Sequence, residues 1–465
     1  MWNSINQALN MIDNFVWGVP LMVLIIAGGL LLTIRLGLLQ IRKLPLALKW
    51  MLQNEEGGKG EISSFSALCT ALSATIGTGN IVGVATAVCA GGPGALFWMV
   101  VAAFLGMATK YSEGLLAVKY RTVAEDGHSL GGPFYYIELG MGKNFKWLAK
   151  IFAFFGVCVG LFGIGTFSQV NGISSAVHGF FDPNDAFTVK ILPFLGEYSW
   201  SVVIASLILS FCVAAVLIGG VKRIASVSQI IVPFMAVIYF VFAVILICCN
   251  ITKVPAAFAT IVTAAFSPKA ITGGAVGSML IAMQKGVARG IFSNEAGLGS
   301  APIAAAAAQT NSPVRQGLVS MTGTFIDTII ICTLTGLSIV LTGAWQVEGL
   351  EGVQVTTYAF QHGLPFPAQF SSFILMLCLV FFAFTTILGW DFYSERCLEY
   401  LSGGNMKHVK IFRWIYILAV FIGPYMTVSA VWTIADIFNG LMAIPNMIAL
   451  FALSGVIVKE TRAFF

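Results

Sequence analysis

The sequence predicts an all-α polytopic membrane protein of about eleven transmembrane helices, with one N-terminal helix before a five-plus-five inverted repeat that contains two broken helices. Three observations predict this fold class: an apolar composition, apolar runs of spanning length, and two polar, glycine-rich interruptions. Hydrophobic residues make up 58% of the 465 residues and charged residues only 10%, against about 25% charged residues in a soluble domain. Mean hydropathy is +0.90. A bilayer solvates such a chain, because a soluble protein must present much of its exterior to water.

Apolar runs long enough to cross a bilayer recur along the whole chain, since a span needs about 20 apolar residues. The first run, near Val16 to Ile34, lacks a basic leader and a small-residue cleavage site, so we interpret it as a retained helix. The segment Pro255–Ser267 is apolar but flanked by proline and a basic residue, and we expect it to lie along the outer surface. The predicted spans are 16–38, 64–90, 94–118, 150–178, 199–220, 225–250, 270–305, 317–343, 369–398, 411–432 and 435–458.

Basic residues are distributed unevenly between the predicted loops, and the cytoplasmic loops of membrane proteins carry the excess of Lys and Arg. With the N-terminus outside, the predicted spans place the C-terminus in the cytoplasm, and of the basic loop residues only Lys190, Lys253 and Lys269 lie outside. The sequence therefore predicts a multi-pass protein of a bacterial or archaeal cell (inner) membrane. The basic residues on the predicted inner side are Arg35, Arg42, Lys43, Lys49, Lys59, Lys119, Arg121, Lys143, Lys146, Lys150, Lys222, Arg223, Arg315, Arg396, Lys407, Lys410, Arg413, Lys459 and Arg462.

The second predicted span contains a polar, glycine-rich interruption, with the sequence SATIGTGNIVG over residues 73–83. Gly77 and Gly79 weaken a helix at membrane depth, and each N–H and C=O freed in hydrocarbon needs a partner. Amides at the start of a half-helix bind an anion such as a carboxylate, and carbonyls at the end of the other half can ligate a cation. The sequence predicts a broken helix whose freed backbone groups bind a ligand.

The seventh predicted span contains a second polar interruption, over residues 283–297, five helices after the first. Glycines in membrane helices also serve close packing, but two interruptions at matching places favour a binding site shared by two halves of opposite orientation. This pattern predicts three parts: an N-terminal helix with its inner loop over 1–60, a first five-helix repeat over 61–250, and a second over 251–465.

The segment GGPGALFWM over residues 91–99, running on to Gly106, resembles the signature of the alanine-or-glycine:cation symporter family. The segments GTGN over 77–80 and SNEAGLG over 293–299 are similar to the same family's pattern, and the resemblance covers nearly the whole chain. One departure is Val100, where the family usually has a second Trp. The resemblance implies the leucine-transporter-type fold of the amino acid-polyamine-organocation superfamily, with one extra N-terminal helix.

The resemblance also implies roles for backbone and hydroxyl groups near the first interruption. The amides of Thr78 and Gly79 would hold the carboxylate of the substrate. Sodium is a hard cation that prefers oxygen ligands, much as calcium does. Its implied ligands are the carbonyls of Ser73 and Ile76 and the hydroxyls of Thr385 and Thr386, while Thr75 and Asn80 are implied to form a second sodium site.

Several side chains are predicted to line the substrate pocket. Gln169 could donate a hydrogen bond to the substrate or hydrogen-bond to a neighbouring helix. The first role is favoured because the equivalent helix of the resembled fold lines the pocket. Trp390 lies one turn after Thr386 and could cap a small pocket or belong to an interfacial belt. The second interruption supplies the remaining predicted pocket residues, for which plain packing is the alternative: Met283, Gln284, Gly286 and Phe292.

Charged residues inside predicted spans form a further class of candidates, because an ionisable group in a membrane is functional or paired. Asp327 lies within the eighth span, and Arg289 is its predicted partner, either as a structural ion pair or as a gate. Lys110 and Glu113, three residues apart, are predicted to pair on one helical face.

These observations predict symport of a small neutral amino acid such as alanine or glycine by alternating access, with Na⁺ as the transported coupling ion and no enzyme activity. The predicted pocket offers no fixed charge for a charged side chain. A proton-coupled transporter of the same fold, with Asp327 or Glu295 as the proton carrier, is the main alternative. A channel is a weaker one, because the loops show no repeated filter motif. The sequence shows no catalytic constellation, no CxxC pair among nine cysteines and no nucleic-acid surface, and it implies no oligomeric state.

Overall fold

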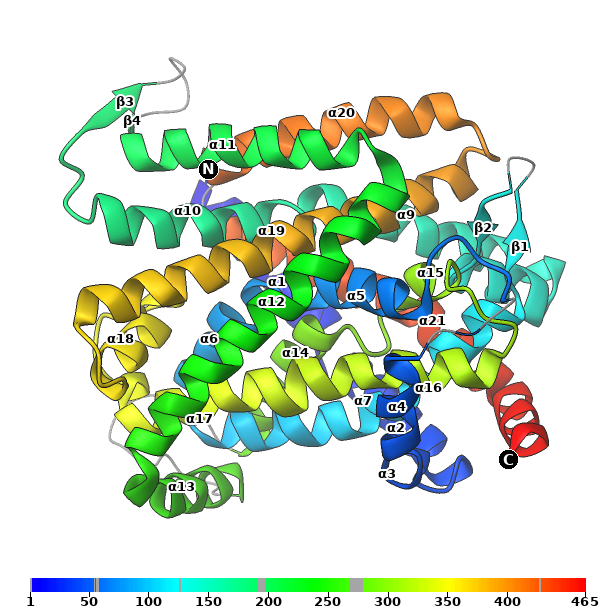
Figure 1. Cartoon of the computed structure of the whole chain (residues 1–465), viewed down its shortest axis with the longest axis horizontal. Helices are drawn as coiled ribbons and strands as arrows, with labels where there is room; N and C mark the ends of the chain where they lie inside the picture. Colours follow the sequence, from blue (N-terminus) through cyan, green and yellow to red (C-terminus); the bar gives the residue numbers. More distant parts are fainter. Residues whose placement is uncertain are drawn as a thin grey trace.

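The computed structural model describes residues 2–53, 55, 58–124, 127–190, 197–266, 279–425 and 428–465. Within these ranges the chain is a bundle of long helices with two short hairpins (Figure 1). Eight helices are long and apolar enough to cross a membrane, and the bent pair Ser64–Thr75 and Gly79–Gly91 makes a ninth span. Two further helices of 16 and 17 residues, Met279–Asn294 and Met406–Ile422, are only slightly shorter. The prediction of an all-α polytopic membrane protein is confirmed.

The elements up to residue 249 include the first predicted broken helix. They are α1 (Trp2–Val16), α2 (Val19–Arg35), α3 (Leu39–Arg42), α4 (Leu44–Met51), α5 (Ser64–Thr75), the π-helix η1 (Gly79–Gly83), α6 (Val84–Gly91), α7 (Gly94–Lys119), β1 (Thr122–Val123), β2 (Ser129–Leu130), α8 (Pro133–Tyr135), η2 (Tyr136–Met141), η3 (Lys143–Phe145), α9 (Lys146–Phe162), α10 (Phe167–Phe181), β3 (Thr188–Lys190), β4 (Glu197–Ser199), α11 (Trp200–Leu217) and α12 (Gly220–Cys249).

The elements of the remaining chain include the second predicted broken helix. They are η4 (Ile251–Lys253), α13 (Val254–Phe266), α14 (Met279–Asn294), α15 (Ala301–Ala305), α16 (Pro313–Thr324), the π-helix η5 (Phe325–Cys332), α17 (Thr333–Thr342), η6 (Ala344–Gln346), α18 (Val353–Gly363), α19 (Ala368–Leu401), α20 (Met406–Ile422), η7 (Gly423–Tyr425) and α21 (Val428–Phe464). The seventh predicted span begins at residue 270, and residues 267–278 lie outside the described residues.

The long helices run between two ends of the bundle. Figure 1 shows α18 and the β3–β4 hairpin at one end, and α15, the β1–β2 hairpin and the C-terminus at the other. Helices α11, α12 and α20 present large apolar side chains outward, with Phe211 76% exposed, Ile230 69% and Trp414 61%. Contiguous apolar surface of this kind on a soluble protein would be a liability. On this chain it fits contact with lipid.

Small residues bring α14 directly against α7. A Cβ on Gly286 would lie 2.1 Å from the carbonyl oxygen of Ala95, and a Cβ on Gly290 would lie 3.0 Å from the side chain of Met99. Glycines at this spacing let two helix backbones approach closely. They therefore do not interrupt α14, which stays helical through Asn294.

The position predicted for the second interruption is accordingly wrong in part. The sequence predicts a break over 283–297, whereas the break begins at Glu295 and ends where α15 begins at Ala301. The fourth predicted span is present as one span, Lys143–Phe181, but an interruption at residues 163–166 that the sequence did not predict separates α9 from α10. The eighth predicted span runs through η5, a π-helix, and π-helical turns are frequent at functional sites.

Candidate functional site

The first break leaves two helical amides with side-chain partners in place of helical ones. The amide of Gly77 donates to Asn80 Oδ1 at 2.9 Å, and the amide of Thr78 donates to Gln169 Oε1 at 3.0 Å. In an unbroken helix these amides would donate to the carbonyls of Ser73 and Ala74. The chain bends by 51° between α5 and η1–α6. The carbonyls at the end of α5 are thereby released from helical bonding.

A hydroxyl of α19 reaches one of these carbonyls. Thr386 Oγ1 donates to the carbonyl of Ile76 at 3.3 Å and to that of Phe382 at 3.0 Å. A Cβ on Gly77 would lie 2.5 Å from Thr386 Oγ1 and 2.9 Å from Gln169 Oε1. A side chain at position 77 would have to displace the side chains of Thr386 and Gln169, so glycine preserves these contacts at the break.

Two polar atoms at the first break have no partner among the described residues. They are Thr78 Oγ1 and Gln169 Nε2, in side chains that are 0% and 1% exposed. Buried polar groups are almost always hydrogen-bonded, so each exception needs an explanation. Both atoms can donate, and both lie next to the amide of Thr78. This part of the break offers a small group of donors suited to a carboxylate.

A buried carboxylate lies beside the same break. Asp327 Oδ1 accepts from Asn80 Nδ2 at 2.7 Å, and Asp327 Oδ2 accepts from Ser293 Oγ at 2.9 Å and Thr328 Oγ1 at 2.6 Å. Asp327 is 0% exposed, and none of the ion pairs formed within the described ranges includes it. A buried charge is costly unless it is paired. The cluster therefore suits a cation or a proton.

The predicted pairing of Arg289 with Asp327 is wrong. Arg289 Nη1 and Nη2 donate to the two carboxylate oxygens of Asp436 on α21, at 3.0 and 2.8 Å. The indole N–H of Trp17 donates to the carbonyl of Asp436 at 2.7 Å. Arg289 lines a cavity in the half of the bundle that the predicted orientation places outside, and we call it the outer cavity. This cavity is lined by Asp13, Asn14, Trp17, Gln284, Lys285, Ala288, Arg289 and Asp436.

The second break is held by acidic side chains. Glu295, with φ +57°, accepts from Trp390 Nε1 at 2.8 Å and from Ser300 Oγ at 2.5 Å. The amide of Gly297 donates to Glu113 Oε1 at 3.1 Å. Asn446 Nδ2 donates to the same Glu113 oxygen at 2.7 Å and to the carbonyl of Gly297 at 2.9 Å. Side chains from α7, α19 and α21 thus fix this turn.

Lys110 and Glu113 form no direct ion pair, although the charge of Lys110 acts on the Glu113 carboxyl as the i,i+3 spacing predicts. Glu113 is committed to the second break, and Lys110 Nζ has no hydrogen-bond partner in the described part of the chain. Lys110 also lines a cavity in the half of the bundle that the predicted orientation places inside, and we call it the inner cavity. The cavity is lined by Ala67, Leu68, Ala71, Leu72, Thr75, Lys110, Ala301, Ala305, Gln316, Ser320 and Gly323.

Comparison with known proteins shows the family of the chain. The chain matches the model of the sodium:alanine symporter family over residues 2–465. The chain belongs to this family. It is 55% identical over 463 residues to an uncharacterized transporter of Haemophilus influenzae, covering 99% of this chain and 96% of that protein. It is 46% identical over 463 residues to the sodium/alanine symporter AgcS of Methanococcus maripaludis, covering 98% and 96%.

A solved structure shows the same fold. The crystal structure of MhsT in complex with L-phenylalanine covers 88% of this chain and 99% of that chain, with a TM-score of 0.55 and 12% identity. The chain therefore has the leucine-transporter-type fold that its sequence predicts. As a member of the sodium:alanine symporter family it is an amino-acid transporter of the symport class and not an enzyme.

The structure brings most of the predicted site residues of this symporter-family chain together. Thr78, Gln169, Asn80, Ile76 and Thr386 meet at the first break through the bonds described above. Further predicted residues lie beside them. A Cβ on Gly79 would lie 3.4 Å from Phe292, and Ser73 Oγ lies against Gly389. Trp390 is fully buried rather than interfacial, and its indole N–H donates to Glu295 of the second break.

Other predicted residues lie elsewhere. Met283, Gln284 and Gly286 are on the outer half of α14, two or more helical turns before the second break. The hydroxyl of Thr75 donates back to carbonyls of α5. The hydroxyl of Thr385 donates to carbonyls of its own helix and lies 3.6 Å from Met235 Sδ on α12.

Sequence reasoning missed the grouping of Asp327 with Ser293 and Thr328, and the role of Glu113 and Glu295 at the second break. A signal was present, because hydroxyl residues precede Asn294 and follow Asp327 directly. Glu113 and Glu295 also lie within apolar spans, where an unpaired acid is costly. Their partners come from segments more than 90 residues away, which spacing along the chain does not reveal.

Proposed function

We propose that the chain is a sodium-coupled symporter of small neutral amino acids, alanine and glycine being the expected substrates. The observation that carries this proposal is the group of unpartnered donors at the first break, Thr78 Oγ1 and Gln169 Nε2. In the proposed complex, the substrate carboxylate accepts from these donors and from the amides of Thr78 and Gly79, at the positive end of the half-helix η1–α6. Gln169 would then release the Thr78 amide to the substrate.

The proposed sodium site lies at the other side of the same break. Its proposed ligands are the carbonyls of Ser73 and Ile76, at the negative end of α5, with the hydroxyl of Thr386 of α19. Thr385, the other hydroxyl that the sequence predicts, would have to leave the carbonyls of its own helix to join them. Sodium here would hold α5 against α19, so that ion binding and closure around the zwitterion favour each other.

A second cation site is proposed around Asn80. The sequence pairs Asn80 with Thr75, but the hydrogen bonds favour Asp327 and Ser293 as the companions of Asn80. A proton on Asp327 is the alternative, because the same buried carboxylate could carry a proton in place of a metal ion. Uptake measured at fixed pH with varied sodium distinguishes the two. Glu295 is the other candidate for the proton carrier, and both of its carboxyl oxygens, like those of Asp327, accept hydrogen bonds.

The expected restriction to small substrates rests on how tightly the first break is packed. Gly77, Gly79 and Phe292 lie within van der Waals distance of neighbouring elements, and Trp390 and Phe292 are 0% and 1% exposed. Met283, Gln284 and Gly286 are better placed to contact a substrate on its way through the outer cavity than at the break.

Alternating access is proposed from the two cavities. One lies on the outer half, beside the Arg289–Asp436 pair, and the other on the inner half, beside Lys110. The basic loops support an N-terminus outside and a C-terminus in the cytoplasm of a bacterial or archaeal inner membrane. Two five-helix repeats are proposed, over 61–250 and 251–465. The first begins with the segment before α5 and the first break, and the second begins with η4, α13 and α14, which precede the second break.

Uptake of radiolabelled alanine into proteoliposomes tests the proposal. We expect uptake to require an inward sodium gradient, and we expect Thr386→Ala to raise the half-saturating sodium concentration by about tenfold or more, because a ligand is lost. Thr386→Ser keeps the hydroxyl and serves as the matched control. Uptake that persists without sodium and in Thr386→Ala would count against sodium coupling at this site.

A further inference from the structure

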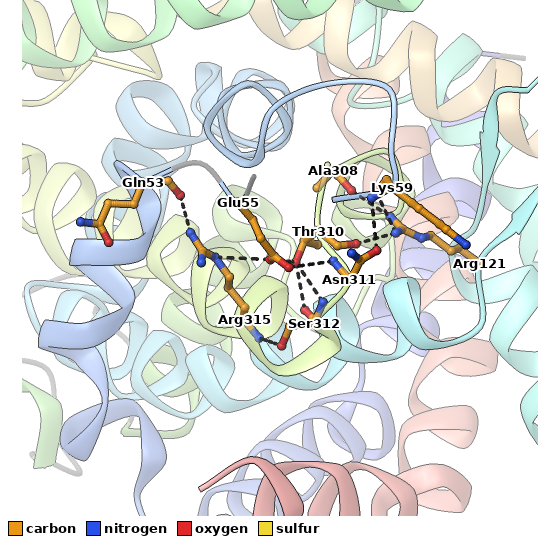
Figure 2. A network of polar contacts seen from close by, with 9 residues as sticks. All are labelled: Gln53, Glu55, Lys59, Arg121, Ala308, Thr310, Asn311, Ser312 and Arg315. Atoms are coloured by element: carbon orange, nitrogen blue, oxygen red, sulfur yellow. Dashed lines mark hydrogen bonds and ion pairs between the residues drawn. The ribbon is translucent and has the colours of Figure 1, made fainter. Parts of the chain in front are cut away.

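Acidic side chains near the inner surface of the bundle, the side that the predicted orientation places in the cytoplasm, have basic partners. Figure 2 shows one such group, in which Glu55 accepts from the hydroxyl of Thr310 and the amide of Asn311 and pairs with Arg315 at 3.7 Å. Further pairs on this side are Lys119–Glu460, Lys146–Glu138, Arg396–Glu399 and Arg413–Glu395. These acids follow the general rule that a charge taken out of water needs a partner.

Asp391 on α19 departs from this rule. Its side chain is 0% exposed, and neither of its carboxyl oxygens has a hydrogen-bond partner within the described residues. None of the ion pairs formed in this part of the chain includes it. An ionised carboxyl here is costly, because it has lost its water and gained no donor. A bound cation or a bound proton would remove this cost.

The charged groups that act on Asp391 come from α19 and α20. Glu395, one helical turn later on α19, adds a second negative charge, and Arg413 of α20 adds one positive charge. Arg413 is already engaged, because its Nε and Nη2 donate to the two carboxylate oxygens of Glu395 at 2.6 and 2.8 Å. An ionised Asp391 would therefore leave this group of three side chains with one uncompensated negative charge.

The other groups around Asp391 offer it no donor. Tyr416 of α20 directs its hydroxyl to the main-chain carbonyls of Gly165 and Ile387, at 2.9 and 2.8 Å. α9 packs on this stretch of α19 beside Ser394, whose hydroxyl donates to carbonyls of α9 and of its own helix. Among the described residues, no other element supplies a charge that acts on Asp391. A metal ion needs several oxygen ligands, whereas a single proton neutralises the carboxyl, so the surroundings favour a proton.

We propose that Asp391 is a proton-binding site, that its proton exchanges with the inner side past Glu395 and Arg413, and that this proton opposes sodium binding at Thr386. Asp391 is 0% exposed, whereas the side chains of Glu395 and Arg413 are 8% and 19% exposed, so the group opens toward water in that order. The proton passes to water, and the negative charge left on Asp391 then shares Arg413 with Glu395, one turn away on the same helix face.

Asp391 lies close enough to Thr386 for its charge to act on sodium there, an effect that rests on the proposed function. Five residues separate the two, or about 7.5 Å along the helix. At this distance a full negative charge inside a protein raises the affinity for a cation about fivefold or more. Sodium and the proton therefore oppose each other by the same factor. This proton site is separate from Asp327 and Glu295, the candidates for a proton carried with the substrate.

Infrared spectroscopy of the purified protein tests the proton site without a transport assay. At neutral pH the protonated carboxyl of Asp391 should give a C=O stretching band that is missing in Asp391→Asn, and the band should disappear as the pH is raised. Glu460→Gln, which removes a partly exposed acid paired with Lys119, is the control and should keep the band. No Asp391 band at neutral pH, or a band that persists to the highest pH at which the protein stays folded, would overturn the proposal.

Glu395→Gln tests the exchange of partners while Asp391 itself stays in place, so it does not depend on how well Asp391→Asn folds. This change removes the repelling charge and frees Arg413 for Asp391. The Asp391 band should therefore disappear at a pH lower than in wild type by about one unit or more. A band that disappears over the same pH range in Glu395→Gln as in wild type would contradict the sharing of Arg413.

The half-saturating sodium concentration for alanine binding tests the link to Thr386. In wild type it should fall about fivefold as the pH rises through the range in which the infrared band disappears. In Asp391→Asn it should stay at the low-pH wild-type value, because asparagine carries no charge at any pH. Equal pH dependence in the two proteins, or none in wild type, would overturn the proposal. Alanine binding that needs no sodium at any pH would instead refute the proposed function, while the infrared band still decides the proton site.

Discussion

The two breaks differ in the side chains that satisfy their freed backbone groups. At the first break, the acceptors are the neutral amides of Asn80 and Gln169, and two buried donors remain without a partner in the described chain. At the second, Glu113 and Glu295 accept from Gly297, Ser300, Trp390 and Asn446. Carboxylate acceptors make hydrogen bonds about twice as strong as neutral ones.

This difference indicates that the two breaks have different roles in transport. A neutral amide such as Gln169 can be displaced by a stronger acceptor, and a substrate carboxylate is one. The side chains that hold the second break come from α7, α19 and α21 and from Glu295 itself, and among its carboxyl oxygens only Glu113 Oε2 has no hydrogen-bond partner in the described chain. We infer that the first break exchanges partners during transport and that the second keeps its geometry.

The largest effect is expected for Gln169→Leu at the first break. This change removes the acceptor of the Thr78 amide and one of the free donors, and each buried group left unpaired costs about 1–3 kcal/mol. The maximal alanine uptake rate divided by the half-saturating alanine concentration should fall about 100-fold, measured from initial rates in proteoliposomes. Ser174→Ala, on the same helix and bonded only to Asn171 of that helix, is the control and should stay near wild type. Normal uptake in Gln169→Leu would remove the distinction between the breaks.

A smaller effect, on the ion rather than on the substrate, is expected for Asp327→Asn. Loss of the charge beside Asn80 should raise the half-saturating sodium concentration about tenfold at fixed pH. Glu460→Gln, which breaks a partly exposed pair with Lys119, is the control, because such pairs contribute about 0–1 kcal/mol. An unchanged sodium dependence together with a lost pH dependence would favour the proton-coupled alternative.

At the second break, stability should change more than affinity. Asn446→Leu removes the donor to Glu113 and to the carbonyl of Gly297, and should lower the free energy of unfolding by about 1–3 kcal/mol. The half-saturating alanine concentration should change less than about threefold. Thermal unfolding in detergent, followed alongside uptake, measures both. A large loss of affinity with unchanged unfolding would reverse the roles assigned to the two breaks.

The smallest effect lies outside both breaks, at the β3–β4 hairpin. Asp182 accepts from Ser199 Oγ and the amide of Ala186, and these hydrogen bonds, that of Ser199 first, lower the pKa of Asp182 below its usual value. A lowered pKa stabilises the fold at pH values above the unfolded-state pKa of about 3.9. This stabilisation is lost as the pH falls through the folded-state pKa. Asp182→Asn should therefore lower the unfolding temperature at pH 7 slightly, and the difference from wild type should close in acid. Alanine uptake per folded molecule should not change.

The sequence predicted the first break well because its causes are local. Gly77, Gly79 and Asn80 stand within four residues of one another, and Asn80 supplies the acceptor for the amide of Gly77. The membrane fold could be predicted for a similar reason, since apolar runs of spanning length need no distant partner.

The second break was misplaced because distant residues decide it. Gln284, Lys285 and Arg289 look like an interruption, yet they remain helical beside an outer cavity that contains Asp13 and Asp436. The pairing of Arg289 joins residues 147 positions apart. The sequence did not predict the interruption of the fourth span at residues 163–166. Gly165 packs tightly against Trp390 there, which accounts for a glycine at that position.

Binding of L-alanine and of L-alaninamide to the purified wild-type protein, measured by calorimetry in sodium and in choline buffers, tests the central claim most directly. The amide keeps the ammonium and side chain but lacks the carboxylate that the donors of Thr78 and Gln169 would bind. We expect alanine to bind in sodium only, and alaninamide to bind about 100-fold more weakly, because several hydrogen bonds to a charged group are lost. Equal affinity for the two compounds, or alanine binding that ignores sodium, would contradict the account.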